Sequence, residues 1–376
     1  MSSQDFGPFD GRIWLNAAHQ GPLPRVAVEA ARCAIELKVA PHRIDDEAFV
    51  DVPLRLRRVL GTTIGAPAEE VILGNSASYG LQLLANGLPW HADDEVLVLA
   101  DEFPATVFPW LICERRGVKV RRLRIARPVL SAQALSKDLT SHTRVVALNW
   151  VRSLTGHIVD VGALSELCAT RGVHLVANVT QGLGALRLDV AATRLAAISC
   201  SGFKWLCGPY ATGFAWIRPD VLAALDPVQA YWLARPDGSA LDLNREGDTA
   251  LRDDLGARAY DVFGTANFLN FLPWAAALEY LVERGLDTIA SHDQALVQQL
   301  IDGLRDRGFE FIGPTETGER AAIVVVTTGD ERRNAELHER LRRTGVDVAL
   351  RAGNLRFSPH LYNTSEEIER TLGAVA

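Results

Sequence analysis

Cysteine is scarce in this chain of 376 residues, and the five cysteines are scattered along it. Their number is odd, and their positions (33, 113, 168, 200 and 207) match neither a metal-binding spacing nor a disulfide framework. We therefore expect no metal site and no disulfide bond. A reducing, cytoplasmic setting fits this use of cysteine.

Long apolar runs and an excess of positive charge are also missing. No run is long enough to cross a bilayer, and the first residues, MSSQDFG, have neither the basic start nor the apolar core of a signal peptide. The formal net charge of −7 gives no basic face for nucleic acid. These absences predict a cytoplasmic protein that binds neither membranes nor nucleic acid.

Lysine is rare, since only four of the 39 Lys and Arg residues are lysines. Lys204 lies between two apolar runs, 195–200 (LAAISC) and 213–217 (GFAWI), which we expect to be buried strands. Because a lone ammonium is costly to bury, Lys204 either extends its amine from a strand end to water or has a chemical task. An amine in such a pocket has a lowered pKa and can attack a carbonyl to form a Schiff base.

Strand-like runs alternate with helical ones from about residue 70 to 218. Apolar runs such as 95–99 (EVLVL) and 144–150 (RVVALNW) are followed by segments with a helical pattern, at 104–115 and 160–171 respectively. This alternation predicts an α/β fold with a mainly parallel sheet, and ligands of such sheets lie at the carboxyl ends of the strands. A long helix at about 268–285 leads to a smaller α+β unit, with strands expected at 322–326 and 355–358 and helices at 333–344 and 365–374.

The segment around the lysine, 201–210 (SGFKWLCGPY), resembles the lysine segment of class V aminotransferase-like enzymes, which hold pyridoxal 5'-phosphate (PLP) on this lysine. Further segments resemble the family in the same order along the chain: 74–78 (GNSAS), 152–156 (RSLTG), 177–181 (ANVTQ), 263–267 (FGTAN) and 355–364 (LRFSPHLYNT). The resemblance spans about residues 12–372. It is nearest to the branch of isopenicillin N epimerase-like proteins and C–S lyases.

This resemblance implies fold type I of PLP enzymes, in which a large domain with a mainly parallel seven-stranded sheet precedes a smaller α+β C-terminal domain. We expect an N-terminal segment near the active site (1–24), a large PLP-binding domain (25–262), and a bridging helix with the small domain (263–376).

The resemblance also assigns residues to the site. Those implied for the cofactor are Ser76, Ala77, Ser78, Phe103, Ser153, Asn178, Gln181, Ser201, Lys204 and Thr265. Phe103 would stack on the pyridine ring, and Ser153 and Gln181 would face the ring hydroxyl. In relatives, the residue matching Thr265 reaches the phosphate of the neighbouring subunit, which implies a homodimer. The residues implied for the substrate are Arg356, which would clamp the α-carboxylate, and Asn16 as a weaker candidate.

Several of these assignments have a plain structural alternative; Ser153, for example, could lie in an ordinary turn. Ser76 or Asn75 could simply cap the helix that follows, and Phe103 could be a core residue at a strand end. Arg356 could be an exposed strand arginine.

Three positions depart from the family pattern. Asn178 stands where the family has an aspartate on the pyridine nitrogen, and a neutral amide cannot act as a counter-charge. Ser153 is shorter than the usual asparagine, and Phe203 replaces a histidine found in many relatives. Because Asn178 carries no charge, we expect the pyridine ring of the cofactor to be a weaker electron sink than in relatives.

The favoured function is a PLP-dependent reaction at Cα or Cβ of an amino-acid substrate, with C–S β-elimination in specialised metabolism, such as antibiotic biosynthesis, as the leading interpretation. Transamination, epimerisation and decarboxylation-coupled oxidative deamination are alternatives on the same scaffold. Persulfide transfer is not expected, because no cysteine follows Cys207. A degenerate binding protein without turnover is the alternative from another class.

Overall fold

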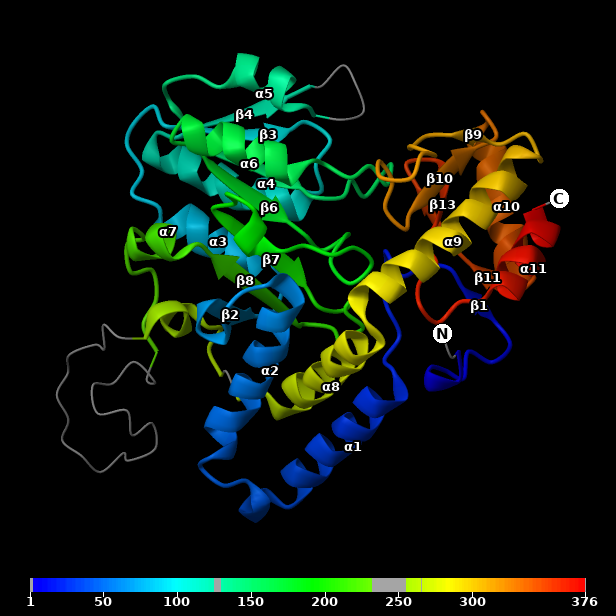
Figure 1. The fold of residues 1–376 in the computed structure, drawn as a ribbon, viewed down its shortest axis with the longest axis horizontal. Helices are drawn as coiled ribbons and strands as arrows, with labels where there is room; N and C mark the ends of the chain where they lie inside the picture. The colour runs from blue at the N-terminus through cyan, green and yellow to red at the C-terminus, as the bar shows by residue number, and fades with distance from the viewer. Residues whose placement is uncertain (1–2, 125–129, 232–254, 265, 376) are drawn as a thin grey trace.

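The computed structural model describes residues 3–124, 130–231, 255–264 and 266–375. Figure 1 shows a large body built around a sheet and a smaller body that contains the C-terminus. Two consecutive helices, α8 (Phe268–Arg284) and α9 (Leu286–Arg305), join them. Gly285 lies between the two helices with a φ of 83°, a backbone conformation that glycine adopts without strain.

The large body contains a seven-stranded sheet of order β2-β8-β7-β6-β5-β3-β4. Its strands are β2 (Val71–Gly74), β3 (Glu95–Leu99), β4 (Lys119–Leu123), β5 (Thr143–Asn149), β6 (His174–Asn178), β7 (Ala197–Ser201) and β8 (Gly213–Ile217). All neighbouring pairs are parallel except the two that involve β8. The predicted mainly parallel α/β sheet is therefore confirmed.

Helices cover both faces of this sheet. Along β3, Leu97 and Leu99 lie in one buried apolar cluster, whereas Val96 and Val98 lie in another, because successive side chains of a strand point to opposite faces. The helices between the strands are α3 (Ala77–Gly87), α4 (Pro104–Leu111), α5 (Ala132–Asp138) and α6 (Val161–Thr170), and α7 (Pro219–Ala223) follows the last strand, β8.

Two N-terminal helices lie beside α8. They are α1 (Arg25–Val39) and α2 (Ala48–Ile64), and both pack against α8 (Figure 1). Short 3-10 helices occur at Ser3–Asp5, Pro41–Arg43, Ala68–Glu70, Ile112–Arg116, Val190–Ala192 and Gly256–Tyr260. The helix expected to follow β3 is shorter than its pattern predicted, because it ends at Leu111 and continues as the 3-10 turn.

The small body contains a four-stranded antiparallel sheet of order β12-β13-β10-β9. Its strands are β9 (Glu310–Phe311), β10 (Val324–Thr327), β12 (Ala349–Arg351) and β13 (Asn354–Phe357), and its helices are α10 (Glu331–Arg343) and α11 (Ser365–Val375). The strand expected at 322–326 begins two residues later, and α9 was not anticipated from the sequence. A separate parallel pair joins β1 (Ile13–Trp14) to β11 (Val346–Asp347), so the N-terminal segment lies against the small body.

Within the described ranges, no helix has the length and apolar character needed to cross a membrane.

Candidate active site

Lys204 lies in a tightly folded loop between β7 and β8. The loop is closed by backbone hydrogen bonds from Gly202 N to Thr212 O at 2.9 Å and from Gly208 N to Gly202 O at 2.8 Å. Glycine is required at 202, since a Cβ there would lie 2.4 Å from Cζ2 of Trp274 on α8. The packing of α8 against this loop therefore holds the lysine at the carboxyl end of the sheet.

The Lys204 amine lies between two aromatic rings. Its Nζ is 5.7 Å from the ring centroid of Phe103 and 5.7 Å from that of Phe203. Burial, together with the positive charge of Arg356, lowers the pKa of Lys204 to about 8. An amine with this pKa is unprotonated in about a tenth of the molecules at pH 7, a far larger fraction than for an ordinary lysine, and only this neutral form attacks a carbonyl.

Arg356 on β13 is a buried guanidinium without a carboxylate partner among the residues that the structure describes. Its side chain is 3% exposed, its Nη1 donates to Ser153 O at 3.2 Å, and its Nε is buried with no hydrogen-bond partner. Burial, together with the positive charge of Arg351, lowers the pKa of Arg356 to about 10. A buried positive charge of this kind is stabilised by an anion, and a substrate carboxylate supplies one.

The N-terminal segment connects the lysine loop to the strand of Arg356. Gly21 N donates to Phe203 O at 2.9 Å, and Ala17 N donates to Ser358 O at 3.1 Å. Asn16 directly precedes Ala17 and forms a β-bridge with Ser358, and its Oδ1 is buried with no hydrogen-bond partner among the described residues. This placement agrees with the expectation that Asn16 is near the substrate, although its contact with a substrate stays a prediction.

The turn between β2 and α3 lies beside the lysine loop. Ser76 is the N-cap of α3, since its Oγ accepts from Tyr79 N at 3.3 Å, and Ala77 N donates to Ser201 Oγ at 2.9 Å. A Cβ on Gly213 would lie 2.5 Å from Ser76 N, so β8 approaches this turn closely. Ser78, one residue further along, is partly buried. Ser76, Ala77 and Ser201, which the resemblance assigns to the cofactor through its phosphate, are thus brought together.

Asn178, at the end of β6, is held by hydrogen bonds at both ends of its side-chain amide. Its Oδ1 accepts from Thr180 N at 3.1 Å, and its Nδ2 donates to Thr106 Oγ1 at 3.0 Å. Gln181, three residues later, donates through Nε2 to Ala18 O at 3.0 Å and accepts from Trp205 Nε1 at 3.0 Å. Gln181 therefore joins the N-terminal segment to the lysine loop, and its contact with a ring hydroxyl stays a prediction.

Phe103 and Ser153 line a small cavity of about 170 Å³, and the ring of Phe103 also lies beside the lysine. Phe103 is 51% exposed, so it is not the core residue that the structural alternative required. Thr265, the residue expected to reach a neighbouring subunit, lies outside the described residues.

A model of the aminotransferase class-V family matches residues 48–371, which is most of the chain. The chain belongs to the aminotransferase class-V family. Among curated relatives, isopenicillin N epimerase from Streptomyces clavuligerus is 27% identical, with 96% of this chain and 93% of the relative covered. A protein from Methanothermobacter thermautotrophicus named "Probable cysteine desulfurase" is 26% identical, with 95% and 92% covered.

Solved structures share the fold of this class-V chain. The apo cysteine desulfurase of Thermococcus onnurineus NA1 superimposes with a TM-score of 0.85 at 21% identity, covering 98% of this chain and 95% of the other. The cystine C–S lyase C-DES, solved with its product cysteine persulfide, has a TM-score of 0.87 at 20% identity, with 97% of each chain covered. The expected fold type I is therefore confirmed.

Pyridoxal phosphate is the cofactor of the class-V family, and the residues present fit it. Lys204 offers an amine of lowered pKa, and the hydroxyls of Ser76 and Ser201 lie together at the N-terminus of α3, where a phosphate is favoured. Phe103 offers a ring beside the lysine. When bound, PLP withdraws electrons from the Cα of an amino-acid substrate.

The sequence interpretation assigned no role to several residues that the structure places at or beside the site. Glu102 contacts Asn149 at the end of β5 and directly precedes Phe103. His19 has a pKa lowered by burial and by the positive charges of Arg351 and Arg356. The position of His19 in the irregular N-terminal segment carried no pattern that could have revealed this proximity.

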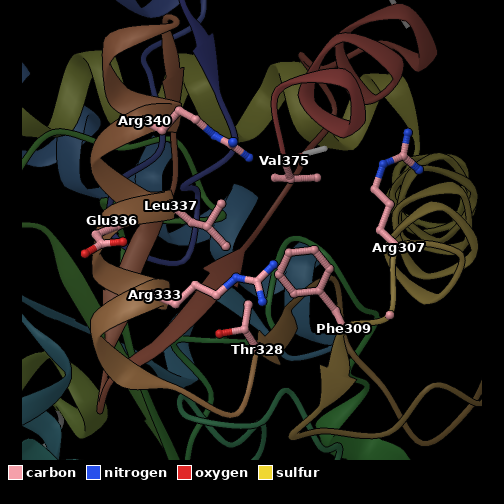
Figure 2. Close-up of a pocket in the computed structure, with 9 residues that line it drawn as sticks. Arg307, Phe309, Thr328, Arg333, Glu336, Leu337, Arg340 and Val375 are labelled. Carbon is pink, nitrogen blue, oxygen red and sulfur yellow. The ribbon is translucent and has the colours of Figure 1, made fainter.

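A hollow of about 630 Å³ lies elsewhere, on the small body (Figure 2). It lies between α10 and the turn after α9, and Figure 2 shows Arg333 and Phe309 pointing toward one another inside it. None of the predicted site residues lines this hollow.

Within the described ranges, no group of three His, Cys, Asp or Glu residues is arranged to hold a metal ion.

Proposed function

We propose that this class-V enzyme is a PLP-dependent lyase that breaks a C–S bond at Cβ of an amino-acid substrate. The observation that carries the proposal is the pairing of a lysine of lowered pKa with a buried arginine that has no described carboxylate partner, Lys204 and Arg356. Such a pair suits a substrate that carries both an amine-bearing carbon and a carboxylate.

Each residue has a separate task in this proposal. Arg356 binds the α-carboxylate and thereby places Cα beside Lys204. Lys204 holds the cofactor and, once its amine is free, moves a proton at Cα. Phe103 and Leu154 line the adjacent cavity and supply apolar surface to it. The reaction converts a cysteine S-conjugate and water into a thiol, pyruvate and ammonia.

The placement of the thiols favours elimination over persulfide transfer. No cysteine follows Cys207, and the one exposed cysteine, Cys33, lies on α1. Cys207 is buried in the lysine loop. A cysteine desulfurase needs a mobile thiol that reaches the substrate sulfur and then leaves with it, and these positions do not supply one.

The test is an assay of the purified, PLP-loaded enzyme on a panel of cysteine S-conjugates, with thiol, pyruvate and ammonia measured together. We expect the three products in equal amounts, and no product from Lys204→Ala. A keto acid that retains the sulfur would show transamination instead, and exchange of the Cα hydrogen without product would show epimerisation. Either result would remove elimination as the main reaction.

We also propose that the enzyme is a homodimer with Thr265 close to the neighbouring subunit's phosphate site. Support comes from the sequence pattern of residues 263–267 and from exposed apolar side chains before and after position 265, Phe263 at 56% and Leu269 at 50%. Light scattering on the purified protein should give twice the chain mass of 41.0 kDa. A monomer at all concentrations that support activity would contradict this part.

A further inference from the structure

The neutral residue Asn178 has a fixed orientation. With Thr180 N on its Oδ1 and Thr106 Oγ1 on its Nδ2, the amide cannot rotate without losing two hydrogen bonds. An asparagine side chain has two N–H donors and two acceptor lone pairs, so one of each stays available for a ligand. Asn178 is 5% exposed, which makes these hydrogen bonds costly to break.

A chain of hydrogen bonds runs from Asn178 to a carboxylate. Thr106 accepts from Asn178 and therefore donates its single proton to Asn149 Oδ1, at 2.7 Å. Asn149 in turn donates through Nδ2 to Glu102 Oε2 and through its backbone N to Glu102 Oε1, the latter at 3.1 Å. Every donor in this chain points toward Glu102.

The sheet register explains how this chain forms. Asn149 and Asn178 are the last residues of the neighbouring strands β5 and β6 and are directly paired across them. Thr106 lies in the first turn of α4, and its side chain is fully buried. Glu102 precedes α4, so one short segment supplies both Glu102 and Thr106.

The charged groups that face Glu102 are Arg152 and Asp101. Burial raises the pKa of Glu102 to about 7, whereas the backbone N–H of Asn149 and the positive charge of Arg152 lower it, and Asp101 raises it further. Arg152 is itself paired with Asp101. Glu102 can therefore change its charge near neutral pH.

We propose that Glu102 is a positioning residue for the cofactor, whose negative charge is transmitted through Asn149 and Thr106 to the Asn178 amide at the ring nitrogen. Hydrogen bonds that donate in one direction polarise one another, so an ionised Glu102 makes the Asn178 oxygen a stronger acceptor. That oxygen then favours a protonated ring nitrogen, as the aspartate of relatives does directly. The inference rests on the proposed PLP site.

A purely structural role for Glu102 is the competing explanation, since Glu102 also accepts from the backbone of Asn149. Removal of the Thr106 hydroxyl, in the middle of this chain of hydrogen bonds, distinguishes the two explanations. Thr106→Val is nearly isosteric and leaves both contacts of Glu102 with Asn149 in place, whereas Thr106→Ser keeps the hydroxyl. If the charge of Glu102 acts through Thr106, Glu102→Gln has no further effect on the ring nitrogen in the Thr106→Val background, whereas a structural role for Glu102 leaves its effect in place.

The experiment uses the enzyme loaded with PLP that carries ¹⁵N in the ring, and NMR reports the protonation of that nitrogen against pH. Borohydride reduction followed by peptide mapping first shows whether the label is on Lys204 in each variant. Absence of label on wild-type Lys204 would contradict the proposed PLP site itself, independently of the role of Glu102.

We expect Glu102→Gln and Thr106→Val each to lower the ratio of protonated to unprotonated ring nitrogen by about tenfold, which is one pKa unit. Thr106→Ser and the control Glu336→Gln, which removes a carboxylate exposed on α10, should resemble the wild type. In the Asn178→Asp background, where the charge is supplied directly, Glu102→Gln should have no further effect. An unchanged ratio in Glu102→Gln and Thr106→Val, or an undiminished effect beside Asn178→Asp, would overturn the inference.

Discussion

His360 and Trp205 join the small body to the lysine loop. The Nε2 atom of His360 donates to Trp205 O at 3.0 Å, and the two rings pack edge to face with centroids 5.1 Å apart. The other ring nitrogen, Nδ1, donates to Asp293 Oδ2 at 2.7 Å. Both partners are acceptors, so both nitrogens carry protons and the ring is positively charged. Burial alone would lower the pKa of His360, but Asp293 raises it to about 10.

Asp293→Asn should destabilise the protein strongly, because it leaves the charge of His360 buried without its partner. Both side chains are fully buried, and removal of one member of such a pair costs about 3–5 kcal/mol of unfolding free energy. Chemical denaturation measures this change. Glu336→Gln, which removes the exposed pair with Arg332 on α10, is the control and should cost less than about 1 kcal/mol. Equal effects of the two substitutions would contradict a buried charged pair.

The same pair predicts how stability depends on pH. The pKa of His360 is higher in the folded state than the usual 6.5, so the folded protein retains a proton that the unfolded chain releases. The stabilisation is therefore complete below pH 6.5 and is lost as the pH rises toward about 10. His360→Asn should flatten the pH dependence of the unfolding free energy in this window. An unaltered slope would show that His360 is neutral.

The rate at which the apo enzyme captures PLP should rise with pH, and the midpoint of this rise should lie near pH 8, since Lys204 attacks only when unprotonated. A free lysine would give a midpoint near 10.5. Arg356→Met should move the midpoint to higher pH, because Arg356 is one cause of the lowered pKa. Stopped-flow absorbance follows the reaction, and Arg332→Met on the exposed face of α10 should leave the midpoint unchanged.

Arg356→Gln should weaken the enzyme specifically toward substrates with an α-carboxylate. Loss of hydrogen bonds to a charged group costs about 1.5–3 kcal/mol, so kcat/KM should fall by about 10- to 150-fold. A substrate whose carboxylate is replaced by an amide should be turned over almost equally by the wild type and the variant. If both substrates lose activity in parallel, Arg356 supports the fold and does not bind the carboxylate.

Gly21→Ala should separate the N-terminal segment from the lysine loop. A Cβ at this position would lie 2.0 Å from Lys204 O, and the backbone cannot accommodate it without a shift. We expect a lower melting temperature and weaker PLP retention. Gly373→Ala on α11 is the matched control, because its Cβ would meet nothing within 4 Å. Its melting temperature should equal or slightly exceed that of the wild type. Full PLP retention in Gly21→Ala would contradict the described contact.

Much of the fold followed from local patterns in the sequence. The alternation of apolar runs with helical segments predicted the parallel sheet, because each strand and helix carries its own periodicity. The turn before α3 and the loop around Lys204 were also predictable, since short segments of unusual composition mark them. Local patterns were less successful at element ends, such as Leu111 of α4, where tertiary contacts decide between α and 3-10 geometry.

The sequence by itself determined the scarce lysine, the amide in place of an aspartate at 178, and the lack of a cysteine after Cys207. Only the tertiary structure decided which partners these residues have. Thr106 and Asn178 are separated by 72 positions, and Glu102 and Asn149 by 47, yet strand register and one helix bring them into a single chain of hydrogen bonds. Contacts at such separations leave no periodic trace in the sequence, because they depend on how distant elements pack.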